Sequence, residues 1–189
     1  KPMDTHLLTR GNSGRPSKKV EPEFLKVLAK AKPAIAKSPN PFTTGRRLAL
    51  AKWIASPRHP LTARVMVNRI WQFHFGRGLV ATPNDFGKAG KPCPNPALLD
   101  WLAAEFVDNG WSIKHMHRVI MNSETYRRAS WQNPANQNTD PGNELVWRQN
   151  LRRLEAEAIR DAILKTSNSL NTAMGGRGFY PNFSGEVIA

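Results

Sequence analysis

The stretch "VNRIWQFHFGRGLVATPNDFG", residues 67–87, places several side chains capable of chemistry close together. Asn68, Arg69, Gln72 and His74 precede a glycine, and Asp85 follows in an irregular loop. An arginine side chain holds anions in a fixed fork, and a histidine can act as acid, base or metal ligand. One interpretation is a pocket lined by Arg69 and His74 and closed by the loop of Asp85. The alternative is structural, since a histidine at a helix C-terminus interacts favourably with the helix dipole.

A second charged cluster is "RRLEAEAIRD", residues 152–161. In a helix Arg153, Glu157 and Asp161 are spaced four apart, and Glu155 and Arg160 lie close by, so an ion-pair ladder explains the pattern. Paired carboxylates can also serve acid and base catalysis. However, two carboxylates one turn apart on one helix point alongside each other and do not flank a scissile bond. The ladder is therefore the favoured interpretation.

Arg69 is also expected to need a partner within the fold. It borders an apolar stripe, and a partly buried guanidinium requires an acceptor. The helix expected around Arg69 has no Asp or Glu of its own. We therefore predict a bridge from Arg69 to Glu155 or Glu157, with His74 beside the loop of residues 76–87.

The sequence lacks the usual metal, nucleotide and haem motifs. His115 and His117 lie two apart on an expected helix, so their side chains should diverge and not share a metal ion. There is no HExxH, no paired CxxC and no glycine-rich phosphate loop. Cys93, the only cysteine, excludes a CxxCH haem site, and its place between two prolines is typical of a loop residue. No metal or cofactor is expected in this segment.

The net charge of +14 is distributed unevenly along the 189 residues. Residues 1–60 carry 13 Lys or Arg and 3 Asp or Glu, a net +10, whereas residues 61–120 carry +3 and residues 121–189 carry +1. A basic segment attracts acidic polysaccharide, nucleic acid or an acidic neighbouring domain over long range. Because the remainder is nearly balanced, specific nucleic-acid binding is not expected.

Hydrophobic residues recur at helical spacing in five segments. The expected helices cover residues 44–56, 62–76, 95–110, a stretch that begins at Ser112, and 145–170, the last either continuous or interrupted near Asn150. Thr44, Asn95 and Ser112 are the expected N-caps, and Gly76 or Gly78 is expected to end the second helix. The core should contain the apolar stripes of these helices, among them Val67, Ile70, Trp71, Leu99, Leu102, Phe106, Met116 and Ile120.

The fold class predicted from this pattern is mainly α, with about five helices in an irregular bundle and long Pro/Gly loops. Residues 1–43 are expected to form a basic extended arm with one short strand at residues 5–10 and one helical turn at residues 22–30. The helical domain should then occupy residues 44–189. No apolar run is long enough to cross a bilayer.

Several long motifs in order resemble the PSD family, a C-terminal domain of unknown function. They are "RRLALAKWIASPRHPLTARV", "VNRIWQFHFGRGLVATPNDFG", "NPALLDWLAAEFVDNGWSIKHMHRVIMNSETYRRAS" and "RRLEAEAIRDAIL". The family occurs in large planctomycete-type proteins that often carry a cytochrome-c-like domain. The resemblance implies export to the periplasm or exterior, with haem c only on a neighbouring domain. Family members usually continue past this C-terminus, so the chain is expected to be incomplete.

The resemblance also implies a set of polar motif positions but no reaction. Carried onto this chain, they are Asn68, Arg69, Gln72, His74, Asp85, His117, Arg118, Tyr126, Arg127, Arg153, Glu155, Glu157, Arg160 and Asp161. Phe73 stands where the family often has His, which removes a His-His ligand pair. Asn168 and Arg177 also replace a usual Gly and a usual Pro.

Three hypotheses follow from the sequence. The first is an extracytoplasmic helical module that packs on sister domains of its own polypeptide and contributes an Arg/His/Glu pocket for an acidic or sulfated polysaccharide. The second is a helical domain that binds nucleic acid non-specifically through its basic arm. The third is a purely structural scaffold between domains. Convergence of the motif side chains on one pocket would favour the first, and their dispersion the third.

Overall fold

The computed structural model describes residues 4–29, 32–36, 42–176 and 178. The chain divides into two compact units, Lys1–Leu151 and Arg152–Ala189. The predicted boundary between residues 43 and 44 stays a prediction. The end of the predicted helical domain, residues 177 and 179–189, lies outside the described residues.

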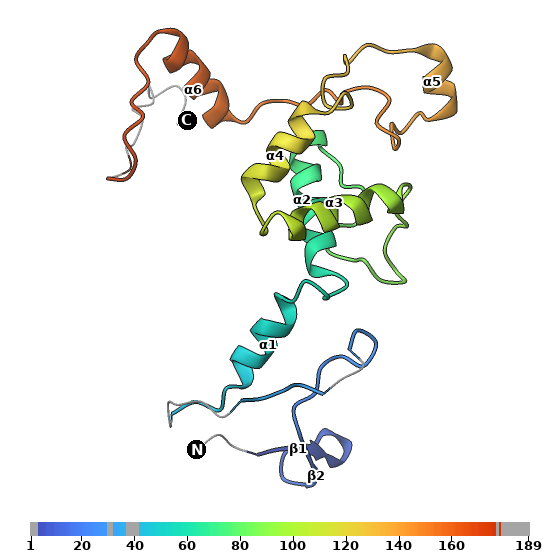
Figure 1. Cartoon of the computed structure of the whole chain (residues 1–189), viewed down its shortest axis with the longest axis vertical. Coiled ribbons are helices and arrows are strands. Elements are labelled where there is room, and N and C mark those ends of the chain that lie inside the picture. Colours follow the sequence, from blue (N-terminus) through green and yellow to red (C-terminus); the bar gives the residue numbers. More distant parts are fainter. Residues whose placement is uncertain (1–3, 30–31, 37–41, 177, 179–189) are drawn as a thin grey trace, which may run out of the picture. The chain divides into compact units, whose positions relative to one another are not determined.

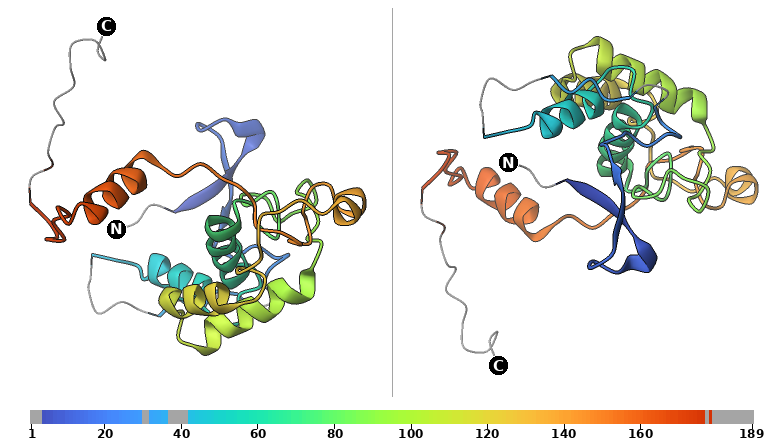
Figure 2. Two further views of the ribbon diagram at one scale, coloured as in Figure 1. Left: turned by 90° about the horizontal axis from the view of Figure 1, so that it is seen from above. Right: turned by 90° about the horizontal axis from the view of Figure 1, so that it is seen from below.

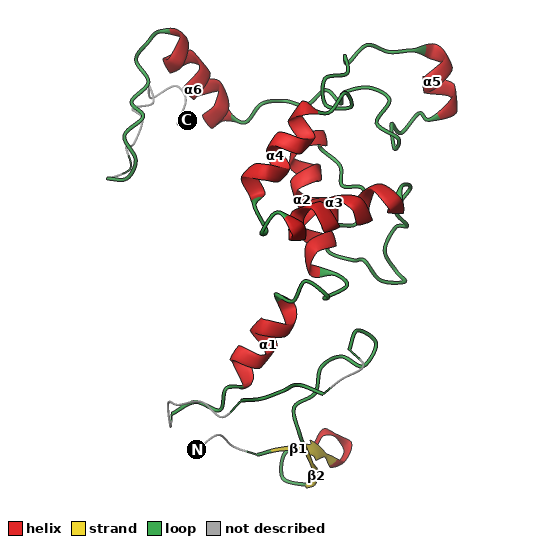
Figure 3. Cartoon of the chain, in the orientation of Figure 1, coloured by secondary structure: helices red, strands yellow, loops and turns green. Residues whose placement is uncertain are grey.

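The described residues are mainly helical, which confirms the predicted fold class (Figures 1 and 3). Six α-helices are present where about five were expected. The first unit holds β1 (Thr5–Leu8), a 3-10 turn (Thr9–Gly11), β2 (Pro16–Val20), α1 (Arg46–Ile54), α2 (Thr62–Phe75), α3 (Pro96–Asp108), α4 (Ile113–Asn122) and α5 (Pro134–Thr139). The second unit holds α6 (Ala156–Thr166).

The core of the first unit lies among α2, α3 and α4, which pack together in the views of Figures 1 and 2. The predicted apolar stripes of these three helices are buried there. Loop residues also contribute, because the chain after α2 folds back onto it. The buried apolar residues are Ala63, Val67, Ile70, Trp71, Phe75, Leu79, Val80, Leu99, Leu102, Ala103, Phe106, Met116, Ile120 and Val146.

Local capping explains why these helices begin and end where the sequence predicts. The Asn95 side chain accepts a hydrogen bond from Leu98 N, with Pro96 in the first helical position. Ser112 accepts from His115 N at the start of α4. Gly76 ends α2 with φ +81°, a left-handed conformation that costs glycine no steric strain.

Helix α1 starts one residue later than the predicted Thr44 cap allows. Gly45 occupies the cap position with φ +75°, and no side chain caps the helix. A Cβ at Gly45 would lie 2.6 Å from Ala36 O, so the close approach of the preceding chain also requires glycine here. None of the α1 residues is buried. Its Trp53 ring stacks on Phe24, with 4.5 Å between ring centroids.

The predicted arm contains more regular structure than expected. The strand predicted near residues 5–10 is β1, but it pairs antiparallel with β2, with Thr5 opposite Val20 and His6 opposite Lys19. The prediction that residues 11–43 lack regular structure apart from a short helix is therefore wrong at β2. The β2 sequence, "PSKKV", is short and basic. It forms a strand because it pairs with β1. Within residues 22–30 a single turn forms, in which Ala29 N donates to Leu25 O.

Helix α5 lies between the fourth and fifth predicted helices, where no helix was expected. Its cap repeats the chemistry at the start of α3, because the Asn133 side chain accepts from Ala135 N and Asn136 N, and Pro134 follows in the first helical position. The same Asn-Pro signal was therefore available in the sequence. The surrounding segment is rich in Asn, Gln and Pro, and this composition favoured a loop over a helix.

The long helix predicted over residues 145–170 is wrong, because only Ala156–Thr166 is helical. The Asp140 carboxylate accepts from Glu144 N and Leu145 N, and the Asn143 side chain donates to Arg148 O. Asn150 donates to Phe75 O at the C-terminal end of α2. Three of these bonds join residues four or five positions apart, and the Asn150 bond spans 75 positions. Together they hold the segment in an irregular conformation that apolar periodicity does not predict.

No helix in the described part of the chain is both long and apolar enough to cross a membrane.

Candidate functional site

Asn68 lies at the centre of the motif and is fully buried. Its Nδ2 donates to Val80 O at 3.0 Å, and its Oδ1 accepts from Val80 N at 2.8 Å. The side chain thus binds both polar groups of one residue in the loop after α2. Gly78 permits this approach, since a Cβ there would lie 2.7 Å from Asn68 Nδ2 and 2.6 Å from Val80 O. Both the nitrogen and the oxygen of the Asn68 amide are therefore engaged inside the fold.

Arg69 and Asp85 also engage the loop after α2, but they do not meet each other. Arg69 is exposed, and its Nη2 donates to Asn84 Oδ1 at 2.6 Å. Asp85 Oδ1 accepts from Gly87 N at 2.8 Å, which closes a local turn. The predicted partners of Arg69, Glu155 and Glu157, belong to the second unit, and that bridge stays a prediction.

His74 and His117 form the closest contact between predicted site residues. His74 Nε2 lies 2.8 Å from His117 Nδ1, and their ring centroids are 5.0 Å apart. The Tyr126 ring meets the His74 ring edge-on, with a centroid distance of 5.3 Å, and also contacts Phe75. The two imidazoles come from the last turn of α2 and the middle of α4. All three predicted residues are half-buried.

The two histidines of the HxH pair diverge, as their helical spacing predicts. His117 faces His74 of α2, whereas His115 Nε2 lies 2.8 Å from Glu105 Oε1 of α3. The pair therefore joins α4 to two different helices. It does not present two ligands to one point.

The remaining predicted residues of the first unit lie apart from this pair. Gln72 is half-buried on α2, and Arg118 is exposed on α4. Arg127 is exposed and donates to Asn122 O at 2.9 Å, so it caps the C-terminal end of α4.

In the second unit, the predicted ion-pair ladder does not form as expected. Arg153 precedes α6 and Glu155 is its N-cap residue, so Arg153 and Glu157 are not related by helical spacing. Glu157 lies in the first turn, where a negative charge complements the helix dipole. The Arg160–Asp161 ion pair measures 3.6 Å between Nη1 and Oδ1, and both side chains are at least half exposed.

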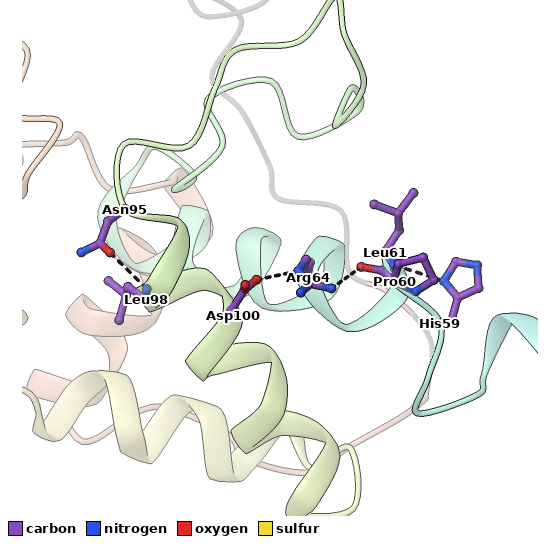
Figure 4. A network of polar contacts seen from close by, with 7 residues as sticks. All are labelled: His59, Pro60, Leu61, Arg64, Asn95, Leu98 and Asp100. Atoms are coloured by element: carbon purple, nitrogen blue, oxygen red, sulfur yellow. Dashed lines mark hydrogen bonds and ion pairs between the residues drawn. The ribbon is translucent and has the colours of Figure 1, made fainter. Parts of the chain in front are cut away.

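A polar network at the N-terminal end of α2 was not predicted (Figure 4). His59 Nδ1 accepts from Leu61 N and Thr62 N and lies 2.9 Å from Thr62 Oγ1. Arg64 Nε pairs with Asp100 Oδ1 of α3 at 2.6 Å and lowers the pKa of that carboxyl group through this hydrogen bond. His59 thus serves as a helix cap. Its position three residues before Thr62 was the available sequence signal.

Cys93 is not an activated thiol. Burial raises its pKa above the ordinary value, and a raised pKa reduces the fraction of reactive thiolate. Among the described residues no group of three or more His, Cys, Asp or Glu side chains could hold a metal ion. Cys93 is half-buried and contacts the core, in accord with its interpretation as a loop residue.

Three surface hollows lie away from the motif side chains. One of about 220 Å³ lies between the segment of Phe24 and Ile35 and helix α1. A shallow one of about 520 Å³ lies along α6, beside Leu154 and Ile163, and a third near Asn150 holds only about 10 Å³. None of the fourteen predicted site residues lines any of the three. The motif residues therefore do not share one of these hollows.

The fold and the contacts define a small helical domain in which four of the predicted polar residues, Asn68, Arg69, Asp85 and Arg127, bind its own loops or a helix end. The chain belongs to the PSD1 family, described as "Protein of unknown function (DUF1553)", whose model matches residues 46–188. The family resemblance seen in the sequence motifs is thereby confirmed. Comparisons with curated proteins and with solved structures found no match.

Proposed function

We propose that this chain is a non-catalytic scaffold module of a large extracytoplasmic protein, and that it binds sister domains of the same polypeptide. The observation that carries the proposal is the use of the motif side chains inside the fold. The buried Asn68 binds both polar groups of Val80, and Arg127 caps α4. Side chains occupied in this way are not available to bind a substrate.

The surface proposed to receive a sister domain is the face of α1 that carries Leu50 and Ile54, which lie four positions apart and therefore share one side of the helix. Their side chains are 47% and 43% exposed, and no residue of α1 is buried. Exposed apolar residues that share one helix face can form an interaction site. Arg47, three positions before Leu50, lies on the same face, so the partner surface is proposed to be apolar with an acidic rim.

Amide hydrogen exchange tests this surface. In the longer polypeptide, the amides of residues 46–54 should exchange more slowly than in the 189-residue chain, because a docked domain restricts opening of α1. Helix α3, whose Leu99, Leu102 and Phe106 are buried in the core, serves as the internal control and should exchange equally in both. Equal exchange of α1 in the two proteins would contradict the proposal.

A second candidate function is binding of an acidic or sulfated polysaccharide. The specific observation in its favour is the net charge of +14, of which +10 lies in residues 1–60. Such binding would be electrostatic and would weaken as salt screens the charges. Nucleic acid presents similar anionic charge, and the same segment would bind it without sequence preference. In either case the basic N-terminal segment is the proposed contact, and the motif side chains are not required.

A further inference from the structure

We infer that the hollow of about 220 Å³ beside α1 binds one aromatic side chain of a sister domain, together with an acidic residue next to that side chain. The inference rests on the proposed scaffold function and names the chemistry of the partner. We call this hollow, between α1 and the segment of Phe24 and Ile35, the α1 hollow. Its apolar walls are formed by Pro22, Phe24, Pro33, Ile35, Ala49 and Leu50.

Two close approaches hold the walls of the α1 hollow together. Phe24 stacks on Trp53 of α1, with the ring centroids 4.5 Å apart and the ring planes 11° from parallel. At the other end of the helix, a Cβ on Gly45 would lie 2.6 Å from Ala36 O. The facing segment therefore meets α1 near both of its ends. The hollow is thus largely preformed, as binding pockets usually are.

The volume of the α1 hollow suits one side chain better than a whole small molecule. Pockets for drug-sized ligands hold about 300–1,000 Å³, which is more than the hollow offers. An apolar cavity of about 150 Å³ accommodates a benzene molecule, so an aromatic ring and its connecting methylene fit here. A sugar ring would instead bury hydroxyl groups against apolar walls, which costs free energy. The expected occupant is therefore an aromatic side chain.

The charges around the α1 hollow favour an acidic residue beside that side chain. Arg46 and Arg47 line the hollow from the first turn of α1, which holds no acidic residue. Glu23 also lines it, but its carboxylate oxygens lie 3.8 Å from the ammonium groups of Lys26 and Lys32. The N-terminal end of a helix adds partial positive charge to that of the arginines. A carboxylate on the partner would therefore meet complementary charge.

Methyl NMR of the 189-residue chain with two small probes tests the α1 hollow. The probe 3-phenylpropionate carries an aromatic ring and a carboxylate, whereas 3-phenylpropanol carries the ring without the charge. Both should shift the methyl resonances of Ile35 and Leu50 saturably, and neither should shift those of Leu48, which is on α1 but not in the hollow. Because exposed ion pairs are weak, the propionate should bind only about two- to fivefold more tightly than the alcohol.

Three variants separate the apolar wall from the charges. Ile35→Ala should weaken binding of both probes at least about threefold, because it removes apolar contact area. Leu48→Ala is the matched control and should bind both as the wild type does. Joint replacement of Arg46 and Arg47 by glutamine should lower the affinity for the propionate to that for the alcohol. Ile35 and Leu48 are 37% and 58% exposed, so their alanine variants should fold.

Three results would each overturn the inference. They are the absence of saturable shifts at Ile35 and Leu50, equal affinities of the wild-type chain for the two probes, and unchanged probe affinity in Ile35→Ala. Each result removes a required part of the site, namely the hollow, the charge or the wall.

Hydrogen exchange in the longer polypeptide distinguishes this inference from the scaffold function. If the sister domain inserts a side chain into the α1 hollow, Ile35→Ala should remove the slower exchange of the α1 amides, and Leu48→Ala should not. Slower exchange that persists in Ile35→Ala would place the sister domain on α1 outside the hollow. That outcome overturns the inference and leaves the scaffold function intact. Equal exchange of α1 in the two wild-type proteins contradicts the scaffold function itself, and with it the inferred partner.

Discussion

Replacement of Asn68 by leucine should destabilise the domain strongly. The substitution keeps a side chain of similar size but removes the donor and the acceptor that serve Val80, which is 4% exposed. A buried polar group without a partner costs about 1–3 kcal/mol, so two such groups cost about 2–6 kcal/mol. Whole domains are stable by only about 5–15 kcal/mol. The variant should therefore lose a large fraction of its free energy of unfolding.

Urea denaturation followed by circular dichroism measures this loss. With a denaturant slope of about 2 kcal/mol per molar, a loss of about 4 kcal/mol lowers the midpoint by about 2 M. Asn109→Leu is the matched control, because its exposed amide donates to Glu105 O at the end of α3, where water can replace it. That control should cost under about 1 kcal/mol. The backbone amide of Val80 should also lose protection from hydrogen exchange in the Asn68 variant.

Asn68→Asp separates the two bonds. An aspartate keeps an oxygen to accept from Val80 N, but it places a second oxygen against Val80 O where a donor is needed. Its unfolding free energy should fall at least as far as that of Asn68→Leu, because a buried charge is added. An Asn68→Leu variant within about 0.5 kcal/mol of wild type would refute the clamp. So would a Val80 amide that remains fully protected.

Two other substitutions test the roles assigned to polar side chains of α2 and its N-terminal cap. Arg69→Met removes an exposed hydrogen bond to Asn84 and one positive charge. The affinity of this variant for dextran sulfate, measured by calorimetry, should therefore fall no further than that of Arg118→Met. A loss of affinity confined to Arg69→Met would show an anion site. Burial lowers the pKa of His59 below its ordinary 6.5. The unfolded chain therefore binds more protons just below pH 6.5, and the melting temperature should fall as pH decreases through that range. His59→Asn, which keeps an acceptor for Thr62 N but does not titrate, should show a weaker pH dependence; an equal dependence would exclude His59 as the cause.

The three core helices were predictable because their signals are local. In α2 and α3 the apolar residues recur every three or four positions, and each helix has a stop or cap within one residue of its end. Gly76 stops α2, Asn95 starts α3 and Ser112 starts α4 through bonds to residues at most four positions away. Such interactions depend on the nearby sequence alone, so the sequence contains all the information that they need.

The role of each candidate site residue was not predictable in the same way. Asn68 looked like a pocket residue, but its partner Val80 lies 12 positions away, and His74 meets His117 across 43 positions. Periodicity predicts which face of a helix a residue occupies. It does not predict which residue of another segment lies opposite. The HxH spacing did predict that His115 and His117 diverge, since that relation lies within one helix.

The sequence by itself determined the mainly helical class, the positions of the three core helices and the family. Tertiary structure decided where the last helix begins and which polar side chains meet. Asn150 illustrates the difference, because its bond to Phe75 O spans 75 positions and belongs to a segment that periodicity assigned to a helix. Helical propensity contributes only a few tenths of a kcal/mol per residue. The bond from Asn150 to the end of α2 and the local bonds of Asp140 and Asn143, each worth about 0.5–1.5 kcal/mol, outweigh it and set the conformation of the segment.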